Sequence, residues 1–208
     1  MSDDCINVSD EFYLHEIVEI HMEAFPGFFL TLLGKAFLTE LYRGFIVSDS
    51  AVLLVNIDHD GSVQGFAAGA INPQLFFSNL RNTQFLSFLC ASTKAFLLNP
   101  IAVSKKLLAA VFYNGDTSNE IKGAALLSSI GVRRNSSGNG VGSTLLKCFE
   151  NYLSINETSQ VYLMTDKKGN DNVLEFYKKR GYEVESTIKK SDGRFMCRLI
   201  KKIQGPLV

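Results

Sequence analysis

Glycines at three alternate positions form the part of this sequence best suited to chemistry. Gly138, Gly140 and Gly142 lie between an apolar stretch and a pattern of apolar residues at helical spacing. Glycine lets the backbone approach a bulky group because it has no Cβ. The first amides of a helix lack an intrahelical acceptor, and they attract negative charge. The pattern therefore predicts a site for an anionic group such as a pyrophosphate, with a tight turn that holds no ligand as the alternative.

Strands and helices on either side must position this loop. Residues 124–132 are small or apolar apart from two serines, which predicts a buried strand. Apolar residues after the loop predict a helix that begins near Gly140 or Val141. Residues 161–166 then predict a second buried strand, and residues 170–182 contain a second helix.

The spacing of the glycines excludes two familiar phosphate loops. A P-loop needs a lysine after its last glycine, and Ser143 follows Gly142 here. A dinucleotide fingerprint needs G-x-G-x-x-G, whereas this chain has G-x-G-x-G. The acid that usually follows about 20 residues later is also missing, because Asp166 lies too far along the chain.

The block from residue 124 to residue 182 resembles the GCN5-related N-acetyltransferases (GNAT). Their central pattern is a strand ending in Val, a short turn and [Gln/Arg]-x-x-Gly-x-[Gly/Ala], which Val132, Gly140 and Gly142 match. Gly138 matches an additional glycine that is common in the family. Ser137 departs from the pattern, because it replaces a long side chain but leaves the backbone amides in place.

A second piece is similar to the family's Asn-x-x-Ala-x-x-Phe-Tyr-x-x-x-Gly-Phe. It reads Asn170-x-x-Val173-x-x-Phe176-Tyr177-x-x-x-Gly181-Tyr182. The resemblance implies an α/β fold with a mixed, mostly antiparallel central sheet flanked by helices. It implies a single domain over residues 1–208, with residues 72–114 as a helical insert before the cofactor-binding strand.

The resemblance also implies acetyl-CoA as cosubstrate and no metal. The pantetheine arm would bind main chain where the two buried strands splay, and the pyrophosphate would bind amides of the glycine loop. Asn170 would bind the cofactor or order the loop beneath it. The remaining cofactor-binding residues implied are Ile130, Gly131, Val132, Ser137, Gly138, Asn139, Gly140, Val141, Gly142 and Ser143.

Tyr177 is the candidate general acid, because the tyrosine of this Phe-Tyr pair often faces the thioester sulfur in the family. A core tyrosine is the alternative. Family members often carry a Glu on the strand before the loop, but residues 124–129 contain no acid. Glu120 precedes them and is expected to lie too far away. A water chain or a residue of the N-terminal half could remove the proton from the amine.

Composition narrows the class of protein. The chain has 208 residues, with 21 Lys and Arg against 21 Asp and Glu, so nucleic acid is not an expected partner. Four cysteines stand far apart, which predicts reduced thiols in a cytoplasmic protein. The three histidines form no ligand motif, and His21 is expected to be a core residue rather than a catalytic one. The start of the chain resembles no signal peptide, and no apolar run is long enough to span a membrane.

The N-terminal half predicts a short strand, a helix capped by Ser9 and Asp10 that runs to about Ala24, and a second helix that ends near Gly44. A hairpin follows, which gives the order that the acetyltransferase fold shows.

Residues 25–29 form an aromatic loop that either lines the acceptor site or packs on itself. The insert at residues 72–114 is interpreted as a helical cap over the acceptor site. A satellite of the core, a homodimer surface and, less favoured, a peripheral membrane contact are alternatives.

These observations together predict an N-acetyltransferase that acetylates a primary amine of a small molecule. The aromatic N-terminal half favours a bulky acceptor such as an amino sugar, including a nucleotide-linked one. A non-catalytic acyl-CoA-binding regulatory module and an enzyme that acts on a protein N-terminus remain alternatives. Transfer of a longer acyl group also stays open.

Overall fold

The computed structural model describes residues 5–91, 121–190 and 193–205, and it contains one seven-stranded sheet. The strand order is β1-β2-β3-β4-β5-β7-β6, and every neighbouring pair is antiparallel except β4 and β5. The strands are β1 (Ile6–Asn7), β2 (Ala51–Ile57), β3 (Val63–Ala70), β4 (Ala125–Val132), β5 (Gln160–Asp166), β6 (Glu183–Lys189) and β7 (Phe195–Lys202). The predicted mixed, mostly antiparallel α/β fold is confirmed.

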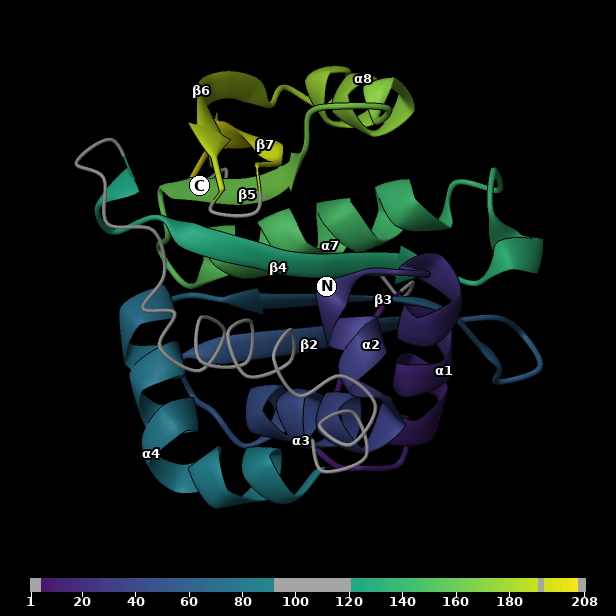
Figure 1. Cartoon of the computed structure of the whole chain (residues 1–208). Helices are drawn as coiled ribbons and strands as arrows, with labels where there is room; N and C mark the ends of the chain where they lie inside the picture. The colour runs from purple at the N-terminus through teal and green to yellow at the C-terminus, as the bar shows by residue number, and fades with distance from the viewer. Residues whose placement is uncertain (1–4, 92–120, 191–192, 206–208) are drawn as a thin grey trace.

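Helices cover both faces of this sheet (Figure 1). They are α1 (Leu14–Ala24), α2 (Phe29–Leu33), α3 (Lys35–Ile46), α4 (Pro73–Ala91), α7 (Val141–Ile155) and α8 (Asp171–Lys178). Alternate residues of β2 point to opposite faces, so Leu53 packs with α1, α3 and α4, whereas Val52 packs with α7. Two hydrophobic cores therefore share the same strands.

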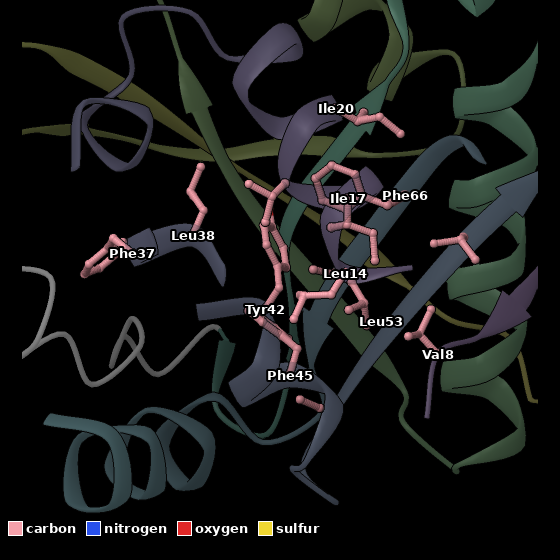
Figure 2. Packing of buried hydrophobic residues seen from close by; sticks show 14 of the residues in the cluster. Val8, Leu14, Ile17, Ile20, Phe37, Leu38, Tyr42, Phe45, Leu53 and Phe66 are labelled. Atoms are coloured by element: carbon pink, nitrogen blue, oxygen red, sulfur yellow. The ribbon is translucent and has the colours of Figure 1, made fainter. Parts of the chain in front are cut away.

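Tyr42 lies near the centre of the first core (Figure 2). Its ring is fully buried and contacts Phe66 edge-on, with the ring centroids 5.2 Å apart. A buried tyrosine needs a hydrogen-bond partner for its hydroxyl. That partner is His21, a second buried polar residue, which is described with the site below.

The helices of the N-terminal half differ in detail from those expected. Asp10 does not cap α1 but accepts a hydrogen bond from the amide of Phe12 (2.9 Å), and the helix begins four residues later. The second helix divides into α2 and α3 at Gly34, whose φ of 92° does not fit a helix. Gly44 does not end α3, because its bare Cα lets the side chain of Leu80 from α4 approach closely.

The first part of the predicted helical insert is the 19-residue helix α4. It packs on α3 through two ring pairs, Phe45 with Phe76 (4.4 Å between centroids) and Phe37 with Phe88 (4.8 Å). This helix therefore belongs to the first core. The remainder of the insert lies outside the described residues, so its proposed position over an acceptor stays a prediction.

The expectation of four reduced thiols is wrong. Cys5 and Cys148 form a disulfide, with their Cα atoms 6.5 Å apart. The two cysteines are 143 residues apart in sequence. The sheet brings them together, because the segment entering β1 lies over the same face as α7. Cys90 and Cys197 remain thiols.

Candidate active site

An opening in the middle of the sheet separates β4 from β5. These two strands pair only at Ala125 with Val161 and at Leu126 with Tyr162. β4 nevertheless continues to Val132, and β3 follows it to the end. Within the described residues, the edge of β4 that faces β5 therefore has no strand partner after Leu126. Backbone groups on that edge are free to bind an extended, amide-containing ligand.

A β-bulge at Ser128 sets which side chains line this edge. Ala68 pairs with Ser129 and Gly69 with Leu127, so Ser128 is the additional residue. Beyond the bulge, Ile130 packs towards α7. A Cβ on Gly131 would lie 2.7 Å from the ring of Phe66, so this position accepts only glycine.

The glycine loop joins β4 to α7 through two glycines with positive φ. Gly138 and Gly140 have φ angles of 87° and 85°, and a Cβ at either position would meet no other atom within 4 Å. Positive φ favours glycine here, and the open space leaves room for a bulky group beside the backbone. Helix α7 begins at Val141, as predicted, and no side chain caps its first turn.

The amides of the loop fall into two groups. Those of Ser137, Asn139 and Ser143 donate to backbone oxygens of Arg134, Ser136 and Gly140 at 3.3, 3.4 and 2.9 Å. No described residue accepts a hydrogen bond from the amides of Gly138, Gly140, Val141 and Gly142. These four free donors at a helix N-terminus suit an anion such as a pyrophosphate.

Asn170 holds the end of β5 in place. Its Nδ2 donates to Thr165 Oγ1 (2.6 Å) and to the carbonyl of Asp166 (3.0 Å). Its backbone oxygen accepts hydrogen bonds from the first turn of α8. Of the two roles expected for Asn170, this geometry fits ordering of the loop.

Tyr177 is 5 % exposed and packs in the second core. Its ring contacts Phe176 and Tyr182, with centroids 5.1 and 5.4 Å away. Burial raises the pKa of the Tyr177 hydroxyl above its ordinary value of 10.0, and the positive charge of Arg180 partly opposes this shift. The phenol is therefore protonated at neutral pH, as a proton or hydrogen-bond donor must be.

A buried polar chain connects β4 to α1. Nδ1 of His21 lies 2.6 Å from the hydroxyl of Tyr42. Burial raises the pKa of that hydroxyl, and the side chain of Ser129 on β4 partly opposes this shift. Burial lowers the pKa of His21 from 6.5 to about 4, so its imidazole is neutral. His21 is buried, as expected, but its Nε2 has no partner in the described parts of the chain.

Acids from α1 reach the far end of β4. Glu16 lies 3.2 Å from the guanidinium of Arg133, and Glu23 accepts a hydrogen bond from the amide of Arg134 (2.8 Å). Both carboxylates thus have basic or amide partners. β4 itself contributes no acid, so its sequence still offers no general base.

The sequence did not single out two polar residues, Tyr42 and Arg180. Tyr42 lies among aromatic residues of the core, and Arg180 ends a basic run, Lys178-Lys179-Arg180, of the kind that is usually exposed. Among the described residues, no group of three His, Cys, Asp or Glu residues could hold a metal ion. No helix in the described ranges is long and apolar enough to cross a membrane.

Comparison with known proteins now gives the family. No curated protein matches this chain. Similar solved folds include a histone acetyltransferase HPA2 and related acetyltransferase from Corynebacterium glutamicum (TM-score 0.61, 19 % identity, 100 % of both chains). Another is aminoglycoside 6'-acetyltransferase type Ii (TM-score 0.62, 12 % identity, covering 98 % of this chain and 99 % of that one). A third is the spermidine/spermine N-acetyltransferase SpeG from Vibrio cholerae (TM-score 0.57, 14 % identity, covering 95 % of this chain and 93 % of that one).

These structural likenesses, each under 20 % identity, show the fold alone. A family model supplies the sequence evidence, because it matches residues 14–182, from the first residue of α1 to the tyrosine after α8. The matched range contains the opened strand pair and the glycine loop. This chain therefore belongs to the acetyltransferase (GNAT) family.

Proposed function

We propose that this protein is an acetyl-CoA-dependent N-acetyltransferase that acetylates a primary amine of a small molecule. The observation that carries the proposal is the opening between β4 and β5, which leads to four free amides at the start of α7. An extended pantetheine arm suits the unpaired edge of β4, near Ile130 to Val132. A pyrophosphate suits the glycine loop, because the amides and the helix dipole both favour negative charge.

The chemistry follows from these positions. The amine nitrogen attacks the thioester carbonyl, a C–N bond forms and the C–S bond breaks. The amine loses a proton, and the departing thiolate gains one or is stabilised by a hydrogen bond. A main-chain amide near Ile130 polarises the carbonyl, and the Tyr177 hydroxyl faces the sulfur. The proton from the amine leaves through water or through a residue of the N-terminal half.

An amino sugar is the favoured acceptor. The loop between α1 and α2 presents Phe28, which is 47 % exposed and contacts Phe25 edge-on (5.6 Å between centroids). Thr31 holds this loop by donating to the carbonyl of Phe25 (2.7 Å). An exposed aromatic ring suits the apolar face of a sugar.

A non-catalytic acyl-CoA-binding module is the second candidate. It is favoured by the lack of any acid on β4 and by Ser137, which replaces the usual Gln or Arg. An amine panel assayed by release of free thiol separates the two. Transfer to any amine supports the enzyme, whereas tight binding of acetyl-CoA without transfer or hydrolysis supports the module.

The first experiment is calorimetric titration of wild type and Gly140→Asp with acetyl-CoA. The aspartate places a negative charge where the pyrophosphate is proposed to lie, so we expect at least a tenfold loss of affinity. Gly140→Asn adds a side chain of the same size without charge, and we expect it to bind more tightly than Gly140→Asp.

Gly61→Asp is the matched control, because Gly61 has a φ of 81° and open space around it in the β2–β3 turn. It introduces a similar backbone strain and the same charge at a position outside the glycine loop. No binding by folded wild type would overturn the proposed function. Equal losses in Gly140→Asp and Gly61→Asp would place the effect in folding rather than at the glycine loop.

A further inference from the structure

We propose that Arg180 binds the pyrophosphate of CoA, and so supplies from α8 the positive charge that the glycine loop lacks. This inference rests on the proposed function and adds a binding residue to it. Position 137 carries serine where members of the family usually have Gln or Arg, so the loop lacks a long polar side chain there. A cation from another element would complete the site.

The Arg180 guanidinium makes three contacts that hold it beside the start of α7. Nη1 donates to the carbonyl of Phe176 (2.7 Å), and Nη2 donates to the hydroxyl of Ser143. Cζ lies 3.7 Å from the centroid of the Phe176 ring. Ser143 belongs to the first turn of α7, so these contacts place a half-buried cation beside the proposed anion site.

Phe176 connects this cation to the free amides. Its ring supports the guanidinium, and the same ring lies 3.7 Å from where a Cβ on Gly142 would be. The amide of Gly142 is one of the four without an acceptor among the described residues. The guanidinium and the glycine loop therefore both lie against the ring of Phe176.

The charges of this arrangement call for an anion. No carboxylate in the described parts of the chain forms an ion pair with Arg180. A helix N-terminus carries roughly half a positive charge, so a guanidinium beside it is held against like charge. An anion between them would reverse this repulsion.

Arg180 also has the donors that an anion needs. Guanidinium groups carry five N–H donors in a planar fork that fits phosphate oxygens. The two hydrogen bonds to Phe176 and Ser143 leave the others available. If Arg180 only capped the C-terminus of α8, the hydrogen bond to the carbonyl of Phe176 would be sufficient. The side chain would then have no need to reach Ser143 in α7.

The experiment compares binding of CoA and of pantetheine, which lacks the pyrophosphate, by wild type and Arg180→Met. Methionine keeps an apolar stem over Phe176 and removes the charge. We expect about a tenfold to hundredfold weaker binding of CoA, and unchanged binding of pantetheine. Arg180→Lys should recover part of the affinity, and the salt dependence of CoA binding should be smaller in Arg180→Met than in wild type.

Lys179→Met is the matched control. Lys179 is the neighbouring residue, and its exposed side chain pairs with Glu175 (2.7 Å) on the same helix. It removes the same charge, and we expect CoA affinity within about twofold of wild type.

Unchanged CoA binding in Arg180→Met would overturn the proposal, and so would equal losses for CoA and pantetheine, since these would show that Arg180 only joins the two helices. The proposed function would survive either result, provided that wild type binds CoA and Gly140→Asp binds it at least tenfold more weakly.

Discussion

Individual residues of the glycine loop have different tasks, although they are neighbours in sequence. The amides of Ser137, Asn139 and Ser143 close the turn on itself. Those of Gly138 and Gly140 are left open, and both glycines adopt positive φ. The bonded amides shape the turn, and the open ones are available to a ligand.

Replacement of Tyr177 by phenylalanine tests the candidate acid. The hydroxyl is lost but the buried ring remains, so we expect turnover to fall by roughly ten- to a thousandfold with little change in acetyl-CoA affinity. Steady-state kinetics with an accepted amine, together with calorimetry, measures both. Tyr182→Phe is the control, because its ring is buried in the same pair. Unchanged turnover in Tyr177→Phe would leave this residue a core tyrosine.

Burial of His21 makes stability depend on pH. Its folded pKa of about 4 lies below the ordinary 6.5, so the unfolded chain binds the proton more readily. The contribution is present above pH 6.5 and is lost as the pH falls towards 4. Between about pH 7.5 and 5, the free energy of unfolding of wild type should fall about 2 kcal/mol more than that of His21→Asn.

Urea titrations at the two pH values measure this difference. Other titrating groups contribute to both proteins, so the comparison isolates His21. Parallel pH dependence in wild type and variant would show that the imidazole is not neutralised by burial.

Close approach of elements explains several glycines of the sheet. A Cβ on Gly69 of β3 would lie 2.3 Å from the ring of Phe149 on α7, and one on Gly65 would lie 2.9 Å from the side chain of Leu145 on the same helix. The two glycines therefore let α7 pack closely on the sheet. The start of that helix is consequently fixed relative to the opening beside β4.

The disulfide adds a covalent link between the segment entering β1 and α7. It closes a loop of about 140 residues, and such links contribute about 2–5 kcal/mol. Reduction with dithiothreitol should therefore lower the melting temperature by about 5–15 °C. Cys90→Ser should keep this sensitivity, whereas Cys5→Ser should melt at the lower temperature with or without reductant. A melting temperature that is the same with and without dithiothreitol in every variant would show that the disulfide contributes nothing to stability.

At the scale of the whole molecule, the described residues form one sheet whose strands contribute to two large cores. β2 contributes Leu53 to the core with α1, α3 and α4, and Val52 to the core with α7. Loss of either core would expose one face of a strand that the other core also needs. We therefore expect a single domain that unfolds in one step.

Urea unfolding followed by far-ultraviolet circular dichroism and by tyrosine absorbance tests this expectation. Coincident transitions would support a single cooperative unit. Two separated transitions would show that the N-terminal and C-terminal halves unfold independently. Oxidised protein should be used, since the disulfide joins the two halves.

Local patterns in the sequence were sufficient for the strands, the glycine loop and the Tyr177 helix. Alternation and helical spacing act over a few residues, so periodicity revealed β4, α7, β5 and α8 with small errors at their ends. The free amides of the loop also follow from local backbone geometry. The helix ends were less predictable. Gly34 interrupts the second helix through its own positive φ, whereas α3 continues through Gly44, where Leu80 of α4 packs closely.

Only the tertiary structure decided which distant residues meet. Cys5 reaches Cys148 across the sheet, and Arg180 reaches Ser143 from a neighbouring helix. His21, in α1, shares a hydrogen bond with Tyr42, in α3. Such pairings depend on strand order and helix packing, which no short pattern records. The sequence by itself therefore determined the fold class and the glycine loop, while the fold determined which buried polar groups pair with each other and which cation lies beside the start of α7.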